Sequence, residues 1–257
     1  MKVTVLAENT ACREDMFPQH GLSLLLDTGD QKILFDMGQD DTFIRNAISL
    51  GIDLSEVDLV ILSHGHYDHG GGLEALLRIN SKAAVYVHEC AFGNYYNAAE
   101  KYIGLNKNLR EHPRLRFIKG SCRISAALHI TDCNDRNWHS QPWGLSRREG
   151  DTRLPDDFRH EQYLEITEGD KRILISGCSH KGIVSIAGYF RPDVLIGGFH
   201  LNKLENEEEL KAIARRLLSG NTRYYTGHCT GEKQFTVLKE SMGDRLLRIA
   251  TGYTFEV

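Results

Sequence analysis

The sequence predicts an α+β protein in which helices flank two β-sheets. Short apolar runs typical of strands alternate with helical patterns in the first third of the chain, and a similar alternation returns after the middle. Two such blocks favour two flanked sheets over one doubly wound sheet. Because no linker is evident between the blocks, we assign residues 1–257 to a single domain.

The first block begins with strands. Apolar runs bounded by glycine or polar residues predict strands at 1–7, 21–28, 32–38, 57–63 and 83–89. The run VDLVILS at 57–63 is almost wholly apolar, so we expect that strand to be buried. Residues 40–50 have helical spacing and are followed by Gly51, which suits a helix C-terminus, and a second helix is expected at 71–79.

The second block has the same kinds of element. Strands are expected at 163–169, 171–177, 193–198, 222–227 and 246–252, and helices at 181–190, 205–220 and 232–240. The first two of these strands are joined by a short Glu-Gly-Asp turn, which predicts a hairpin.

The stretch from about 90 to 160 is the least regular part of the chain. It contains a polar segment too long for an ordinary connection, which predicts an irregular insertion near the active site. Its cationic and aromatic side chains would suit an anionic, ring-containing substrate, and they suit a solvated surface equally well. These side chains are Arg136, Trp138, His139, Trp143, Arg147 and Arg148.

Composition excludes several classes of function. The 31 basic and 35 acidic residues give a net charge of −4, which argues against a nucleic-acid or membrane-surface binder. No window approaches the ~18 apolar residues of a membrane span. The 6 cysteines lack CxxC spacing, so we interpret them as reduced thiols of a cytoplasmic protein. No feature favours a particular oligomeric state.

The segment SHGHYDHGGG, directly after the buried strand at 57–63, is the strongest functional signal. Residues i and i+2 of an extended segment point the same way, so His64 and His66 can share a metal ion. Asp68 and His69 can serve a second ion, and two ions ~3.5–4 Å apart can activate a hydroxide at neutral pH. A solvated loop is the alternative, but this spacing favours a metal site.

The four residues of this segment cannot complete two metal sites, so further ligands are expected at other strand ends. Cys178 and His180 follow one predicted strand, His200 follows the next, and His228 the one after. We expect His180 and His228 to be ligands. His200 suits a substrate contact or a catalytic role better than coordination.

The pattern His64-x-His66-x-Asp68-His69 resembles the signature of the metallo-β-lactamase superfamily. The segments HGLSLLLDT, GCSHKGI, GGFHL and GHCTG are similar to a branch often labelled 7,8-dihydropterin-6-methyl-4-(β-D-ribofuranosyl)aminobenzene-5′-phosphate synthase. The resemblance implies an αββα sandwich with its metal site at one edge, and it makes Asp36 an acidic residue that orients the metal site without binding metal.

The sequence departs from the superfamily at Cys178, where a bridging aspartate is usual. A thiolate there would favour zinc, and the alternative is that His180 alone completes the site. His160 is a candidate for the isolated histidine of the third superfamily motif. His20 matches a branch motif and is a candidate pocket residue.

Two functions follow from these expectations. The first is a hydrolase that acts on a phosphate-containing small molecule through a metal-bound hydroxide, with two zinc ions (or manganese or iron) and with Asp68 and His200 in catalytic roles. The alternative, implied by the resemblance, is a transferase that condenses a dihydropterin diphosphate with an aminobenzene riboside phosphate. The expected partner in both cases is an anionic small molecule.

Overall fold

The computed structural model describes residues 1–136, 138 and 143–257. His139, one of the side chains considered for substrate binding, lies outside the described residues.

The two large sheets contain most of the strands. The strands are β1 (Lys2–Ala7), β2 (Ser23–Asp27), β3 (Lys32–Phe35), β4 (Leu59–Ile61), β5 (Ala84–His88), β6 (Asn94–Tyr96), β7 (Leu115–Ile118), β8 (Ser121–Arg123), β9 (Leu128–Thr131), β10 (Ser146–Glu149), β11 (Thr152–Pro155), β12 (Tyr163–Glu168), β13 (Lys171–Ile175), β14 (Val194–Ile196), β15 (Arg223–Thr226), β16 (Leu246–Arg248) and β17 (Thr254–Glu256). Their order is β17-β1-β2-β3-β4-β5-β7 in the first sheet and β16-β15-β14-β13-β12-β9-β8 in the second.

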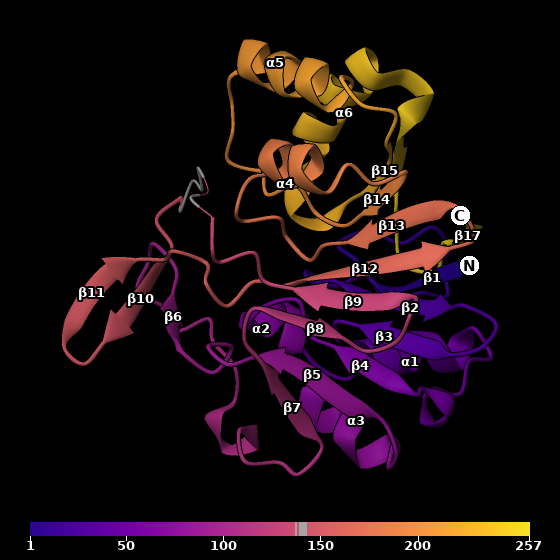
Figure 1. The fold of residues 1–257 in the computed structure, drawn as a ribbon, viewed down its shortest axis with the longest axis vertical. Helices are drawn as coiled ribbons and strands as arrows, with labels where there is room; N and C mark the ends of the chain where they lie inside the picture. Colours follow the sequence, from indigo (N-terminus) through magenta and orange to yellow (C-terminus); the bar gives the residue numbers. More distant parts are fainter. Residues whose placement is uncertain (137, 139–142) are drawn as a thin grey trace.

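The helices cover the outer faces of the two sheets, except for the short second one, which lies at the carboxyl end of β4. They are α1 (Thr42–Ser49), α2 (Tyr67–Gly70), α3 (Leu73–Ile79), α4 (Ile183–Phe190), α5 (Glu207–Leu217) and α6 (Glu232–Met242). In Figure 1, α1 and α3 lie below the first sheet, and α4, α5 and α6 lie above the second. The predicted αββα sandwich is therefore confirmed.

Burial on both faces explains the nearly continuous apolar strands. In β2, Leu24 and Leu26 point into the apolar cluster between the sheets, where Ile173 and Ile175 of β13 also lie. Leu25 points the other way, into the cluster under α1 and α3. Successive side chains of a strand point to opposite faces, so a strand covered on both sides needs apolar residues at every position.

Parallel pairing places the carboxyl ends of the strands that precede the candidate site residues at one edge of each sheet. Strands β3, β4, β5 and β7 are parallel to one another, as are β13, β14, β15 and β16. The residues that follow β3, β4, β13, β14 and β15 therefore emerge at the carboxyl ends of their sheets, where α/β proteins commonly bind ligands.

The stretch 90–160 is more regular than the sequence indicates. It contributes β7 to the first sheet and β8 and β9 to the second, and β11-β10-β6 form a separate three-stranded sheet. This small sheet projects from the body of the molecule in Figure 1, and we call it the arm. These strands are 3 or 4 residues long, too short for a clear alternating pattern.

Two further expectations were wrong in detail. The strand predicted at 246–252 ends at Arg248 as β16, and a further strand, β17, follows it and pairs with β1. Asp68 and His69 lie in the short helix α2, a helical turn that the glycine-rich sequence did not indicate.

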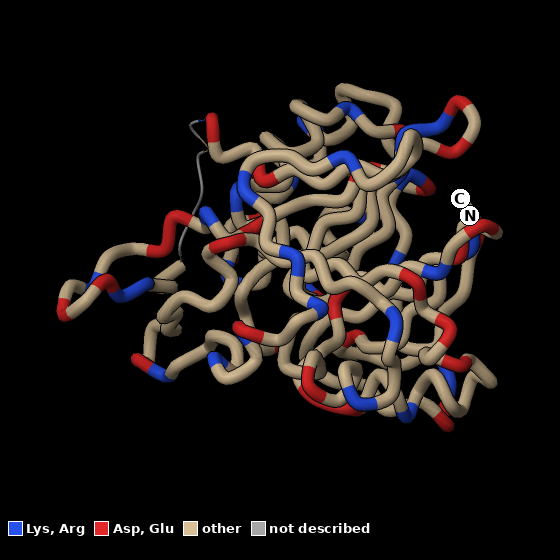
Figure 2. Tube along the Cα trace, turned by 60° about the horizontal axis from the view of Figure 1, so that its bottom comes forward, with Lys and Arg blue, Asp and Glu red and all other residues tan. Residues whose placement is uncertain are grey.

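Acidic and basic residues alternate along the Cα trace in all parts of the fold (Figure 2). Within residues 1–136, 138 and 143–257, no helix combines the length and the apolar character that crossing a membrane would require.

Candidate metal centre

The histidine segment lies at the carboxyl end of β4. His64 follows the strand after Ser63, His66 precedes the first turn of α2, and Asp68 and His69 lie within that turn. Of these side chains Asp68 is the most exposed, at 9%, and His64 and His69 are fully buried. A buried group of this kind needs polar partners or a cation.

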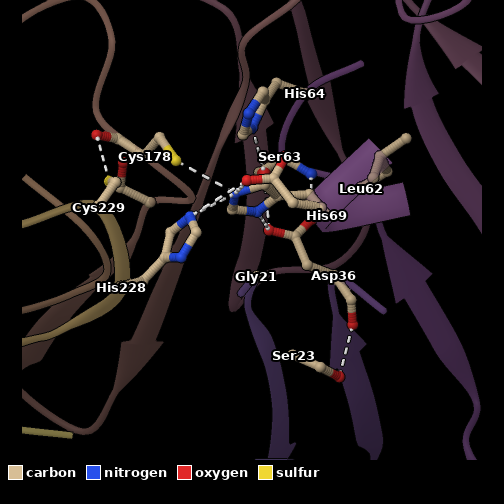
Figure 3. A network of polar contacts seen from close by, with 12 residues as sticks. Gly21, Ser23, Asp36, Leu62, Ser63, His64, His69, Cys178, His228 and Cys229 are labelled. Atoms are coloured by element: carbon tan, nitrogen blue, oxygen red, sulfur yellow. Dashed lines mark hydrogen bonds and ion pairs between the residues drawn. The ribbon is translucent and has the colours of Figure 1, made fainter. Parts of the chain in front are cut away.

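The second sheet places Cys178, His180 and His228 against this segment. His180 Nε2 lies 3.3 Å from His64 Nε2. His69 Nε2 lies 3.1 Å from Cys178 Sγ and 3.2 Å from His228 Nε2. Figure 3 shows Cys178 and His228 reaching from one side of the site toward His69 on the other.

Two groups that each contain a pair of histidines share the thiol of Cys178, beside a third group that consists of Cys178, His200 and Cys229. His64, Cys178 and His180 form one group whose ligand atoms lie within 4.8 Å of one another, and His69, Cys178 and His228 form the other. Such a shared atom is the arrangement expected of a bridging ligand between two ions. The structure thus brings together the residues that the sequence assigned to two metal positions, while their roles as ligands remain predictions.

Asp36 determines which nitrogen of His69 faces the site. Its Oδ2 lies 2.6 Å from His69 Nδ1 and accepts a hydrogen bond from Ser63 Oγ at 2.7 Å, and its Oδ1 accepts one from Ser63 N at 2.7 Å. The carboxylate can only accept, so His69 carries its proton on Nδ1 and presents the lone pair of Nε2. Asp36 has a left-handed backbone (φ 59°) and is fully buried, consistent with the orienting role expected for it.

The same logic applies to His64. Ser63 Oγ donates its proton to Asp36, so it accepts at 2.8 Å from His64 Nδ1–H. His64 Nε2 is then a lone pair directed at His180 Nε2. Burial, and then the neighbouring imidazoles, lower the pKa of both His64 and His180 well below the usual value. Both rings are therefore neutral, which is the form that binds metal.

The contacts of His228 show whether the site suits a cation. Its Nδ1 lies 2.9 Å from Asn9 Oδ1, so Nε2 faces His69 Nε2 at 3.2 Å. Two lone pairs at that distance repel, so a positive charge must occupy the position. Burial alone would lower the pKa of His228, but the charges of Cys229 and Asp68 outweigh burial and raise it to about 9. The site therefore favours a cation here, either a proton or a metal ion.

The environment of the site lowers the pKa of Asp68 and raises the pKa of Cys178. Burial opposes ionisation of Asp68, but the charge of His69 and hydrogen bonds from His20 and His228 hold its pKa well below the usual range. Burial raises the pKa of the Cys178 thiol. A bound cation would convert that thiol to a thiolate.

Gly177 allows the two sheets to approach at this point. A Cβ atom at residue 177 would lie 2.2 Å from Ser63 Oγ and 3.1 Å from His64 Nδ1. We expect Gly177→Ala to displace Ser63 from Asp36 and to lower the free energy of unfolding by about 1–3 kcal/mol. Urea denaturation would measure this loss. Gly188→Ala is the control, because a Cβ atom there meets no atom within 4 Å, and an equal loss in both variants would contradict the prediction.

The other predicted residues lie around this centre. His20 is half-exposed, and its Nε2 lies 3.2 Å from Asp68 Oδ2. The ring of His200 packs against that of His180 with centroids 4.1 Å apart, and both of its nitrogens are buried without a hydrogen bond to any described residue. His160 accepts a hydrogen bond from Gly65 N at 2.9 Å and lies behind the ligand segment.

Sequence reasoning missed several residues that support the site. Asn9 and Ser63 orient the candidate ligands His228 and His64, Cys229 lies beside Cys178, and the buried Glu161 accepts hydrogen bonds from the backbone of His180 and Lys181. Asn9 follows a predicted strand, so its position in AENT was a usable signal. Glu161 lies just before a predicted strand, and its sequence context gave no such signal.

The cationic side chains of the middle stretch mostly have partners within the protein. Arg136 stacks on Tyr189 and Arg148 on Tyr96, while Arg147 forms ion pairs with acidic neighbours. Their expected role in substrate binding stays a prediction.

Three comparisons relate the chain to known proteins. The family model described as metallo-beta-lactamase superfamily matches residues 16–217. An uncharacterized protein of Methanocaldococcus jannaschii is 30% identical over 93% of this chain and 94% of its own length. The 7,8-dihydropterin-6-methyl-4-(beta-D-ribofuranosyl)-aminobenzene-5'-phosphate synthase of that organism is 30% identical over 98% of this chain and 95% of its own length. A solved structure described as a metal-dependent hydrolase of the beta-lactamase superfamily has a TM-score of 0.82 at 28% identity, covering 100% of this chain and 99% of its own.

Proposed function

Because the chain belongs to the metallo-β-lactamase superfamily, we propose that it is a metal-dependent hydrolase of a phosphate-containing small molecule. The observation that carries the proposal is the pair of ligand groups that share Cys178. Similarity to the metal-dependent hydrolase of TM-score 0.82 supports it.

The donor set suits a pair of zinc ions, and manganese or iron are the alternatives. His64, His66 and His180 would hold one ion, Asp68, His69 and His228 the other, and Cys178 would lie between them. Imidazole and thiolate are the ligands that zinc prefers. When bound, such a pair stabilises negative charge on an oxygen and lowers the pKa of water.

The protein's own groups would orient the ions and manage the proton. Asp36 and Ser63 hold His69 and His64 with their Nε2 atoms toward the site. Asp68 is ionised and tied to His20 and His228, so it can position a ligand or accept a proton transiently. His200 has both ring nitrogens free of described partners, which suits proton transfer to a leaving group or a contact with the substrate phosphate.

A second candidate function is the transferase reaction. It is favoured by the identity of 30% to the synthase over nearly the whole of both chains. In that reaction the same ligands would hold cations that neutralise a diphosphate leaving group, and no water would need to be activated. A single fold supports both chemistries, so the substrate must decide between them.

We further propose that the protein works in the cytoplasm on an anionic small molecule. All 6 cysteines are free thiols in the structure, as expected in a reducing compartment. The net charge of −4 does not favour a nucleic-acid partner.

Elemental analysis and a phosphoester panel, on wild type and Asp68→Ala, test the proposal. We expect about two equivalents of metal per chain, with hydrolysis lost in the variant. Metal without hydrolysis, together with product formed from the dihydropterin diphosphate and the riboside phosphate, would favour the transferase. Wild-type protein that binds no metal would contradict both functions.

A further inference from the structure

We propose that Asp156 is a positioning residue for His66: its carboxylate holds the Nε2–H of His66 and leaves Nδ1 as the nitrogen available to a metal ion. The inference deepens the proposed function and rests on the metal centre described above.

The contact between the two side chains is buried. Asp156 Oδ2 lies 3.7 Å from His66 Nε2, and the two residues are 2% and 4% exposed. No described residue forms a hydrogen bond with His66 Nε2. The gap exceeds an ordinary hydrogen bond by about 0.5 Å, so the two side chains are in contact without forming a hydrogen bond. Asp156 is thus the acceptor in place for this nitrogen.

Among the candidate ligand histidines, His66 at Nε2 and His180 at Nδ1 have a buried nitrogen without a hydrogen bond to any described residue. His69 is held by Asp36 and His228 by Asn9, each through the Nδ1 nitrogen. Metal-binding histidines nearly always donate their remote N–H to a carboxylate or a carbonyl group. With Asp156 as its partner, His66 follows the same rule through the opposite nitrogen.

Asp156 is itself held in place. Its Oδ1 accepts a hydrogen bond from Phe158 N at 2.9 Å, and its Oδ2 lies 3.2 Å from His160 Nε2. His160 Nδ1 accepts from Gly65 N at 2.9 Å, so the proton of that ring is on Nε2 and is donated to Asp156. Both nitrogens of His160 are thus engaged, which assigns that residue to support of Asp156 and argues against coordination.

These residues connect the arm to the metal centre. Asp156 directly follows β11, and Tyr95 of β6 packs on His160 and His66 with ring centroids 4.0 and 5.8 Å apart. The base of the arm therefore forms one wall of the His66 position. The stretch 90–160 therefore supplies side chains that contact His66, one of the candidate ligands.

The test compares Asp156→Asn with Asp157→Asn. Asp157 is the adjacent acidic residue, partly exposed and paired with Arg147 and Arg159 rather than with a histidine. Zinc affinity would be measured by competition with a chromophoric chelator, alongside metal stoichiometry at saturation and the melting temperature without metal. We expect Asp156→Asn to weaken zinc binding about 10–100-fold with unchanged stoichiometry, and Asp157→Asn to match wild type.

Three results would overturn the inference. Equal affinity in the two variants would remove the positioning role. A lower melting temperature with unchanged affinity would make Asp156 structural only. A loss of one equivalent of metal at saturation would make it a ligand.

A measurement on the metal-free wild type separates this inference from the proposed function. Nitrogen-15 NMR of the histidine rings reports which nitrogen of His66 carries the proton, and it requires neither metal nor a folded variant. We expect the proton on Nε2, and a proton on Nδ1 would contradict the inference. A wild type that binds zinc but hydrolyses no phosphoester would refute the hydrolase proposal alone.

Discussion

Cys178→Ala is expected to abolish binding of the metal pair, whereas Cys229→Ala leaves it nearly unchanged. Cys178 belongs to both groups of ligand atoms, so its loss removes a donor from each position at once. Cys229 is an equally buried thiol beside it, but its group, with Cys178 and His200, contains none of the four histidines of those two groups. We expect apparent affinity to fall by well over ~100-fold in the first variant, beyond what loss of a supporting hydrogen bond costs.

Cobalt substitution would show whether the thiol coordinates. A thiolate bound to cobalt gives a charge-transfer absorption in the near ultraviolet, which should be present in wild type and Cys229→Ala and absent in Cys178→Ala. Cys178→Asp should bind two ions without that band, because a carboxylate can bridge the same positions. A wild type without the band, or a Cys178→Ala variant with full metal content, would show that His180 serves without Cys178.

Asp36→Ala is expected to have the largest effect on stability among single substitutions at the site. The carboxylate is fully buried and accepts hydrogen bonds from Ser63 N, Ser63 Oγ and His69 Nδ1. Its removal leaves those buried donors unpaired, and breaking a buried charged network costs about 3–5 kcal/mol. It also frees His69 to rotate, so zinc affinity should fall together with stability.

Ser23→Ala is the matched control for Asp36. Ser23 Oγ donates to the backbone carbonyl of Asp36 at 2.8 Å, so this variant perturbs the same residue without touching its carboxylate. We expect Ser23→Ala to lower the free energy of unfolding by only about 1 kcal/mol and to leave the zinc affinity unchanged. Urea denaturation of metal-free protein, with zinc titration of each variant, measures both effects. Similar losses in the two variants would indicate that the carboxylate has no special role.

The elements that carry the site were largely predictable. Periodic apolar runs located β3, β4, β13, β14 and β15, with their ends within three residues, because each is buried and therefore apolar. The histidines stand directly after these strands, where a polar cluster has no packing reason to be. At these positions an apolar pattern that predicts a strand is followed at once by residues that predict a metal site.

The middle of the chain was harder to interpret. Strands as short as β6 and β8 bury few residues, so their alternation is not visible in the sequence. The partnership of Asp156 with His66 joins residues 90 positions apart, through an arm whose placement no local pattern encodes. Contacts of that kind depend on how the sheets pack.

By itself the sequence determined that this protein has two flanked sheets and a histidine-rich cluster of potential metal ligands at their strand ends, because burial and ligand chemistry leave local patterns. Only the tertiary structure decided which nitrogen of His64, His69 and His228 faces the site, and that two groups of potential ligands share the Cys178 thiol. The reason is physical. Tautomers are chosen by hydrogen-bond partners such as Asp36 and Asn9, which come from other strands and meet the histidines only when the two sheets pack together.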